Sequence, residues 1–254
     1  MAIKIISLNL WWGGHLFPAI IDFLKAEDPD IVALQEVYNS DNPSLADNYR
    51  SMEKLRAALN YTHSDSAEAY QESLPAGKVP HGNAVLSKFP ITERSMSYLA
   101  EPTAENIEYQ DIPEHWPITP APLQYVEIET PSGKLNVFNM HGVWDMDGDN
   151  YSQRRQRMSQ VMIAETSGKA HVILTGDSNA KPSNQAMRNL EAHLQPVFGD
   201  ELVSTFNMKR KDNPGYATAA VDLMYVSSDV KIVSRTCPQV DISDHLPLVV
   251  TFEL

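Results

Sequence analysis

The sequence predicts an α/β protein in which two packed β-sheets are flanked by helices. Apolar residues alternate and then cluster through residues 2–10, recur at helical spacing over 17–24 and form a short buried run at 31–34. This strand–helix–strand opening is typical of α/β folds. Further along the chain the predicted strands outnumber the helices, and they fit neither a regular strand–helix alternation nor a closed eightfold barrel. We therefore expect two sheets packed against each other.

The composition is typical of one folded domain, which we predict to span residues 1–254. Hydrophobic residues make up 43% of the chain and charged residues 21%, with no repeat, low-complexity tract or flexible linker. The single cysteine, Cys237, excludes an internal disulfide and suits a reducing compartment. The first residues lack the layout of a signal peptide, and no segment is long enough to span a membrane. We therefore predict a cytoplasmic protein without a membrane span, and the sequence implies no protein partner.

The formal net charge of −13 bears on the partners of the chain. Proteins that bind nucleic acid without sequence preference usually carry a basic surface, because neutralising phosphates supplies most of their affinity. The acidic balance therefore disfavours long polynucleotide substrates without excluding them. Clustered carboxylates equally suit a divalent-cation site, because a bound cation would neutralise them.

After this opening, periodicity predicts one further helix and one further strand in the first half of the chain. Apolar side chains recur at helical spacing over residues 52–59. Residues 61–80 are polar and show no clear period, and strand character returns over 81–91. Residues 92–122 are rich in proline, glutamate and aromatic residues but have little periodicity, which indicates a long loop.

The second half of the chain alternates between strand and helix patterns. Two strands over residues 123–130 and 134–141 flank Pro131-Ser132-Gly133, which is a hairpin signal. The remaining predicted elements are, in order, a helix over 151–166, a strand over 172–177, a helix over 183–194, and strands over 221–226, 231–235 and 248–252.

The clearest chemical signal is the stretch Ile173–Ala180, in which a buried strand is followed by polar side chains. Residues two apart in extended backbone point to the same side, so we expect Asp177 and Asn179 to project together from the strand end. A carboxylate beside an amide suits holding a water molecule, because one accepts its proton and the other fixes its orientation. The alternative is a strand that ends in an ordinary Asx turn.

Other predicted strands also begin or end with side chains that carry chemistry: Asn9, Glu36, His141, Asp222, Asp244 and His245. Two of these residues have an alternative interpretation without a role in function. Glu36 could be a helix-cap or surface carboxylate, and His141, taken alone, could be a structural histidine. Asp222 is harder to explain in this way, because its strand looks buried on both faces and an unpaired charge there would be costly. It needs a partner, and His245 would serve.

Seven short blocks span nearly the whole chain: SLNL at 7–10, DIVALQEV at 30–37, GNAVLSKFPI at 82–91, NMH at 139–141, GDSN at 176–179, VDLMYVS at 221–227 and SDHLP at 243–247. Their residues and order resemble the motifs of the endonuclease/exonuclease/phosphatase superfamily, the deoxyribonuclease-I-like metal-dependent phosphoesterases. The resemblance implies a four-layer α/β sandwich, with two packed, mostly antiparallel or mixed β-sheets flanked by helices.

The resemblance implies a metal site. Glu36 would be the main ligand, with Asn9 beside it and Asp244 as a further contact, and Mg²⁺ suits such oxygen ligands, with Mn²⁺ as a substitute. One position departs from the pattern, because apurinic endonucleases and tyrosyl-DNA phosphodiesterases have an aspartate where this chain has Trp11. The ligand set is thinner as a result, and those two substrate classes are less expected. Trp11 and Trp12 would instead form an aromatic wall at the site or cap the core.

The resemblance also implies catalytic roles. Asp177 would activate or orient the attacking water, and Asn179 would hold that water and the phosphate. His245 would stabilise the phosphoryl oxygens, with Asp222 orienting and charging its imidazole. His141 would act near the leaving group.

Three features bear on the substrate. Asn9 and Trp11 would contact it from the first strand, and Phe206 matches an aromatic position that often lines the cleft of the family. Lys209-Arg210-Lys211 is the clearest basic run and is either a set of phosphate contacts or a solvated loop.

We therefore predict a Mg²⁺-dependent phosphodiesterase or nuclease that cleaves small phosphoesters or short or single-stranded nucleic acid by in-line attack of water. The alternatives are a phosphatase of lipid or sugar phosphates and a binding module that has lost catalysis.

Overall fold

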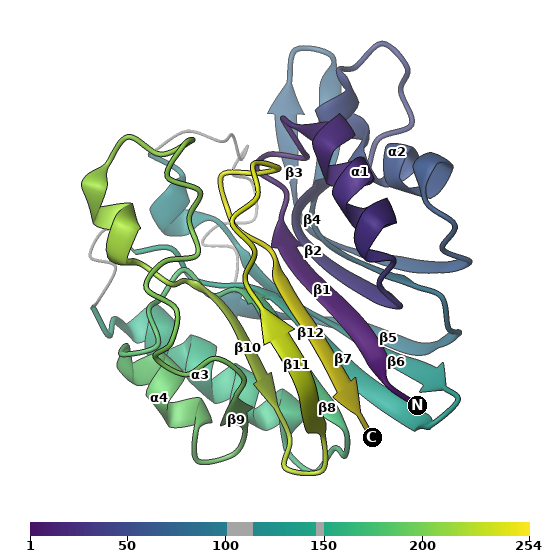
Figure 1. The fold of residues 1–254 in the computed structure, drawn as a ribbon. Helices are drawn as coiled ribbons and strands as arrows, with labels where there is room; N and C mark the ends of the chain where they lie inside the picture. The colour runs from purple at the N-terminus through teal and green to yellow at the C-terminus, as the bar shows by residue number, and fades with distance from the viewer. Residues whose placement is uncertain (101–113, 146–149) are drawn as a thin grey trace.

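The computed structural model describes residues 1–100, 114–145 and 150–254. It shows two six-stranded sheets that lie between two pairs of helices (Figure 1). In the described residues, no helix is both long enough and apolar enough to cross a membrane.

The first sheet has the strand order β11-β12-β1-β2-β4-β3. Its strands are β1 (Ile3–Asn9), β2 (Ile31–Tyr38), β3 (His63–Leu74), β4 (Gly77–Ser87), β11 (Lys231–Thr236) and β12 (Leu248–Glu253). β1 and β2 are parallel, and the other neighbouring strands are antiparallel. The helices α1 (Phe17–Glu27) and α2 (Ser51–Ala58) lie on its outer side, with the 3₁₀ turn η1 (Asp47–Arg50) directly before α2 (Figure 1).

The second sheet has the strand order β5-β6-β7-β8-β10-β9. Its strands are β5 (Ile91–Ala100), β6 (Ala121–Thr130), β7 (Gly133–His141), β8 (Val172–Asp177), β9 (Gln195–Pro196) and β10 (Asp222–Val226). Only β7 and β8 are parallel among its described pairs. The helices α3 (Gln153–Thr166) and α4 (Gln185–Leu190) lie on its outer side, and the 3₁₀ turns η2 (Trp116–Ile118) and η3 (Pro214–Thr218) lie in its loops.

Three groups of buried apolar side chains hold these four layers together. The group between the sheets includes Ile5 and Val137. A second group joins the first sheet to α1 and α2 and includes Leu24. A third joins the second sheet to α3 and α4 and includes Met158 and Leu190. Each sheet therefore buries both faces, which explains the near-continuous apolar runs of its central strands and confirms the predicted four-layer α/β sandwich.

The structure places strands in two polar segments, one without a predicted element and one predicted as a loop. Residues 61–80 contain β3 and the start of β4. The segment 92–122, predicted as a loop, contains most of β5 and the start of β6. Residues 101–113 of this segment lie outside the described residues. β3 and β5 each lie at one edge of their sheet. An edge strand packs against one neighbour and exposes much of its surface, so it needs no regular apolar alternation. The buried part of β5 is confined to its last two residues.

The ends of two helices also differ from prediction. The helix predicted over 151–166 is α3, which begins at Gln153 because the Ser152 hydroxyl accepts a hydrogen bond from the backbone N–H of Arg155. The helix predicted over 183–194 is α4, which covers only Gln185–Leu190. The Asn184 side chain caps it by accepting a hydrogen bond from the backbone N–H of Ala186. The prediction of a single domain over residues 1–254 stays a prediction.

The fold brings polar strand ends from both sheets to one edge of the sandwich. At the carboxyl ends of the parallel strands β1 and β2, Asn9 lies opposite Gln35. At the corresponding ends of β7 and β8, His141 lies opposite Asp177. β10 runs antiparallel to β8 and begins at Asp222, which is directly opposite Asp177. A hydrogen bond between Asn9 and Asp177 joins these two groups of strand ends.

Candidate functional site

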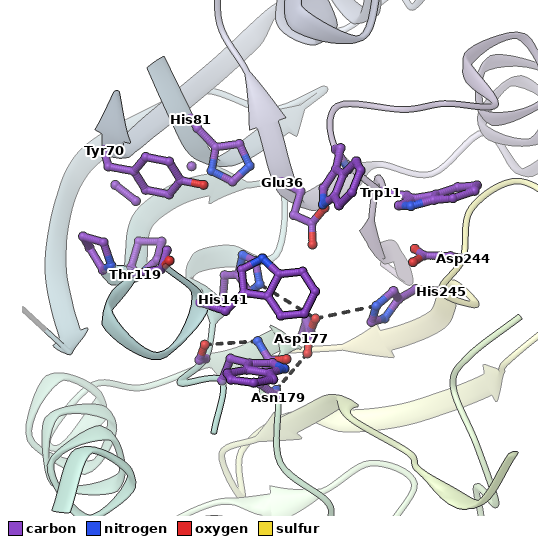
Figure 2. Close-up of a pocket in the computed structure, with 18 of the residues that line it drawn as sticks. Trp11, Glu36, Tyr70, His81, Thr119, His141, Asp177, Asn179, Asp244 and His245 are labelled. Carbon is purple, nitrogen blue, oxygen red and sulfur yellow. Dashed lines mark hydrogen bonds and ion pairs between the residues drawn. The ribbon is translucent and has the colours of Figure 1, made fainter. Parts of the chain in front are cut away.

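A pocket opens at this edge of the sandwich. Eight of the residues singled out in the sequence line it: Trp11, Glu36, His141, Asp177, Asn179, Phe206, Asp244 and His245. Figure 2 shows Asp177 near its centre, with Glu36, His141 and His245 around it. Two further residues singled out in the sequence, Asn9 and Asp222, are buried behind this lining.

A β-bulge brings Glu36 into the pocket. The pairing of β2 with β4 shifts register between Leu34 and Val37, and Glu36 has a φ of 55°, in the left-handed region that residues other than glycine rarely adopt. Its Oε1 accepts a hydrogen bond from Asn9 Nδ2 at 2.9 Å, and its Oε2 accepts one from the Trp12 backbone N–H at 2.6 Å. The bulge turns Glu36 toward the pocket while Gln35 and Val37 stay buried.

The backbone after β8 differs from the sequence prediction. The strand ends at Asp177, and Asn179 has a φ of 52°, so the two residues do not share an extended backbone. Instead, Asp177 Oδ1 accepts a hydrogen bond from the Asn179 N–H at 2.8 Å, which makes the Asx turn that was the alternative. Both side chains nevertheless line the pocket, because the turn brings Asn179 back toward it, where its amide donates to the Gly142 carbonyl.

Asn9 links the two carboxylates of the pocket. Its fully buried amide donates to Glu36 Oε1 at 2.9 Å and to Asp177 Oδ2 at 3.1 Å, and its Oδ1 accepts from the Trp11 backbone N–H. The two acceptor oxygens therefore lie no more than about 6 Å apart, a distance at which like charges repel. Burial raises the pKa of the Asp177 carboxyl above its usual range, despite the opposing effect of His245.

Behind the pocket lining, Asp222 orients His245. The Asp222 carboxylate is 2% exposed and its Oδ2 lies 2.8 Å from His245 Nδ1. Its Oδ1 makes no hydrogen bond to any residue that the structure describes. Burial alone would lower the pKa of His245, but the carboxylates of Asp222 and Asp177 outweigh it and raise this pKa to about 10. His245 is therefore an imidazolium near pH 7, and its Nε2 lies 3.8 Å from Asp177 Oδ2.

Asp177, Asp222 and His245 also lie close enough together to suggest a metal site, with one ligand atom from each within 4.8 Å of the others. A protonated imidazole has no lone pair for a metal, and its Nδ1 already faces Asp222. We therefore interpret these three residues as a charged hydrogen-bond chain.

His141 approaches Asp177 from the other side. Its Nε2 lies 3.9 Å from Asp177 Oδ2, so two imidazoles flank one carboxylate (Figure 2). The close approach of Gly142 to the turn after β8 fixes this arrangement. A Cβ at Gly142 would lie 2.1 Å from the Ser178 carbonyl oxygen, so only glycine fits.

The basic run at 209–211 divides between two environments. Arg210 forms a two-point ion pair with Asp241 outside the pocket, whereas Lys211 lines the pocket and its Nζ lies 2.5 Å from Asp244 Oδ2. Lys211 Nζ also lies 5.1 Å from the centre of the Phe206 ring, which packs on His245 with ring centres 4.5 Å apart. The structure therefore places a lysine ammonium on the carboxylate that the sequence analysis expects to contact metal.

Several lining residues are not singled out in the sequence: Tyr70, His81, Trp116, Thr119, Trp144 and Tyr216. Four of them lie in the segments over 61–80 and 92–122 or at their borders, where the sequence has no clear periodicity. The aromatic content of 92–122 was the one signal that pointed to them. Trp11 and Trp12 lie on the pocket, as the aromatic-wall alternative expects.

Comparison with known proteins supports the fold. The chain matches the endonuclease/exonuclease/phosphatase family over residues 6–245. No curated protein matches it in sequence. Among solved structures it is similar to an endonuclease/exonuclease/phosphatase from Beutenbergia cavernae DSM 12333, with 19% identity and a TM-score of 0.75 over 100% of this chain and 72% of that chain. A protein of the same description from Bacteroides vulgatus has 18% identity and a TM-score of 0.74, with 100% of this chain and 99% of that chain covered.

The structure is also similar to a mannosyl-6-phosphatase from Bacteroides thetaiotaomicron VPI-5482, with 17% identity and a TM-score of 0.70 over 99% of this chain and 100% of that chain. At such identities the likeness of structures shows the fold alone. Members of the matched family are phosphoester hydrolases and generally depend on a divalent metal. Because the family match extends over nearly the whole sequence and the sandwich fold agrees with it, this chain belongs to the endonuclease/exonuclease/phosphatase family.

Proposed function

We propose that this protein is a Mg²⁺-dependent phosphodiesterase that acts on small or single-stranded substrates. The observation that carries the proposal is the environment of Asp177. This buried carboxylate lies between two imidazoles, 3.8 Å from His245 Nε2 and 3.9 Å from His141 Nε2. One of the imidazoles is held in its charged form by Asp222. A base between one charged imidazole and a second imidazole suits hydrolysis of an anionic ester.

The donor chemistry beside Asp177 suits a hard divalent cation. Glu36 and Asp244 bring carboxylate oxygens to the pocket, which Mg²⁺ and Mn²⁺ prefer as ligands. The Oδ1 of Asn9 already accepts from the Trp11 N–H, so Asn9 would support Glu36 rather than bind the ion. The closeness of Glu36 and Asp177 supports the same assignment, because positive charge relieves their repulsion. When bound, the ion would offset negative charge on the phosphate oxygens.

The roles of the chain's own residues follow from their positions. Asp177 would accept the proton of the attacking water while the water oxygen bonds to phosphorus, and Asn179 would orient that water. The bond from phosphorus to the leaving oxygen would break, and His141 would donate a proton to that oxygen. The charged His245 would face the phosphoryl oxygens. Asn9 and Asp222 have no place on the pocket surface, so we assign them to positioning Glu36, Asp177 and His245.

A phosphatase is the second candidate. Lys211 in the pocket, together with charged His245, provides two positive charges that also suit a dianionic monoester. The fold likeness to a mannosyl-6-phosphatase is in line with this alternative. A catalytically silent binding module is less well supported, because it has no need of an oriented, charged histidine beside a buried carboxylate.

The two candidates are separated by a substrate screen. Purified protein is assayed with phosphomonoesters, small phosphodiesters, and single- and double-stranded DNA and RNA, in Mg²⁺, Mn²⁺ and EDTA. We expect hydrolysis of diesters with Mg²⁺ or Mn²⁺, no activity in EDTA, and slower cleavage of long duplexes. Release of phosphate from monoesters with diesters untouched would instead support the phosphatase.

Lys211 provides a first prediction at single-residue level. Lys211→Ala removes the ammonium that faces the pocket, so KM for a phosphoester should rise about tenfold, more than kcat falls. Steady-state kinetics measure both constants. Arg210→Ala is the matched control, since Arg210 pairs with Asp241 outside the pocket, and it should change KM less than about twofold. Equal effects of the two variants would show that the basic run acts as one solvated patch.

The pairing of Asp222 with His245 provides a second prediction. His245→Ala should lower kcat at least ~10²-fold, because it removes the cation that faces the phosphate. If Asp222 acts through His245, the double variant Asp222→Asn/His245→Ala should be little worse than His245→Ala alone. The measurement is kcat for the two single variants and the double variant, each corrected for its folded fraction. Losses that simply add would contradict the pairing.

A further inference from the structure

The pocket has two chemically different halves. One half carries the charged residues Glu36, Asp177, Asp244, Lys211 and His245. The other, which we call the aromatic half, is formed mainly by Tyr70, His81, Trp116, Thr119 and Trp144. Figure 2 shows Tyr70, His81 and Thr119 across the view from Asp244 and His245, with Glu36 and Asp177 between them.

The aromatic half is assembled from separate elements. Tyr70 in β3 pairs directly with His81 in β4, just after a shift in strand register, and their rings lie 4.8 Å apart. Trp116 belongs to η2, and Trp144 follows β7. The indole rings of Trp116 and Trp144 meet edge to face with centres 5.5 Å apart. Two strands and two loops therefore converge on one wall.

His81 keeps this half uncharged. Its side chain is 5% exposed and lies against Tyr38 and Tyr70. Burial, together with the charge of His141, lowers the pKa of His81 to about 3, so the imidazole is neutral near pH 7. Its Nδ1 makes no hydrogen bond within the part of the chain that the structure describes. The aromatic half thus has no formal charge but retains hydrogen-bonding capacity.

The distribution of tryptophan supports a binding role for this wall. The chain has 4 tryptophans, and all of them line this pocket. Trp11 and Trp12 lie in the loop beside Glu36, whereas Trp116 and Trp144 belong to the aromatic half. Indole faces stack on planar rings and on the apolar faces of sugars, and an indole carries no charge to offset that of a phosphate. An uncharged aromatic wall beside a phosphate-binding centre therefore suits the organic part of the substrate.

We propose that the aromatic half is a binding subsite for one neutral, ring-bearing group of the substrate. This group is a nucleoside or a sugar attached to the phosphate that is cleaved. The substrate class is then a small phosphoester that carries such a ring, rather than a polyanionic chain on both sides of the scissile bond. This inference deepens the proposed function and rests on it for the reaction, but ring binding needs neither metal nor turnover.

The test compares binding of three phosphodiesters of equal charge to the protein in EDTA, by NMR titration. The probes are dimethyl phosphate, the 5′-methyl phosphodiester of thymidine and the 6-methyl phosphodiester of glucose. We expect at least one ring-bearing ester to bind about tenfold more tightly than dimethyl phosphate. Tighter binding of the thymidine ester would identify the bound group as a nucleoside, and tighter binding of the glucose ester would identify it as a sugar. Because hydrolysis is not measured, a failure of the proposed function leaves the result interpretable.

Variants then locate the ring. The double variant Trp116→Ala/Trp144→Ala should remove most of the tenfold advantage of the ring-bearing ester over dimethyl phosphate. Binding of dimethyl phosphate itself should stay unchanged. Both tryptophan side chains are partly exposed, so their removal leaves the core packed. Trp144→Phe should retain the advantage. Trp12→Ala, the same substitution on the other side of the pocket, should also retain it. The proposal is overturned if neither ring-bearing ester outbinds dimethyl phosphate, if the advantage survives the double variant, or if Trp12→Ala removes it instead.

Discussion

Asp177→Asn should lower kcat at least ~10²-fold while the protein stays folded. The substitution keeps the shape of the side chain and its acceptor oxygen for the Asn179 N–H but removes the proton acceptor. It also removes one of the carboxylates that hold His245 in its charged form. Steady-state kinetics on a phosphodiester in saturating Mg²⁺ measure the loss, and circular dichroism checks the fold.

The matched control for this change is Asp200→Asn. Asp200 pairs with Arg188 on the surface, and its side chain is 69% exposed, so kcat should stay within about twofold of the unmodified protein. Near-normal turnover of Asp177→Asn would show that the attacking water does not need this carboxylate. Asp177 would then be assigned to holding Asn9 and His245 in place.

Glu36→Ala should abolish stabilisation of the protein by divalent metal. A metal that binds only the folded protein stabilises it by about 2.7 kcal/mol at 100 times its Kd, which raises the Tm of a chain of this size by about 5–10 °C. We expect this rise with Mg²⁺ or Mn²⁺ in the unmodified protein and none in Glu36→Ala. Differential scanning calorimetry measures the shift without any substrate.

Glu201→Ala serves as the control for Glu36→Ala, since its side chain is 60% exposed and pairs with Arg235 on the surface. It should show the full metal-dependent rise in Tm. The metal response is compared within each variant, because Glu36→Ala also removes the acceptor of the Asn9 amide and of the Trp12 N–H and so changes the metal-free stability. An unchanged metal response in Glu36→Ala would remove Glu36 from the metal site.

Much of the fold follows from local patterns. Central strands such as β1 and β8 are covered on both faces, so they show apolar runs that any window of sequence reveals. The edge strands β3 and β5 show no such run because solvent covers part of their surface. Their sequences therefore resemble loops, and their strand character comes from hydrogen bonds to β4 and β6.

The candidate site divides in the same way. Residues at the ends of buried strands, such as Asp177 and His141, are recognisable in the sequence. A polar side chain directly after an apolar run costs free energy to bury unless it has a partner, so it indicates a function or a specific contact. The bulge that turns Glu36 into the pocket involves a shift of pairing between two strands, which a single strand does not encode. Nothing local distinguishes Lys211 from Arg210 either, and their different partners follow from the path of the loop.

The family motifs, the two-sheet architecture and the polar residues at the strand ends are predictable from local sequence, because each depends on residues that are neighbours in the chain. Three further features of the site come from the folded chain alone: Asn9 and Asp222 support it from behind, Lys211 is the one residue of the basic run that lines the pocket, and all four tryptophans lie around it. These features depend on which segments meet across the two sheets. Such contacts join residues more than a hundred positions apart, as between Asn9 and Asp177, and leave no periodic signal in either segment.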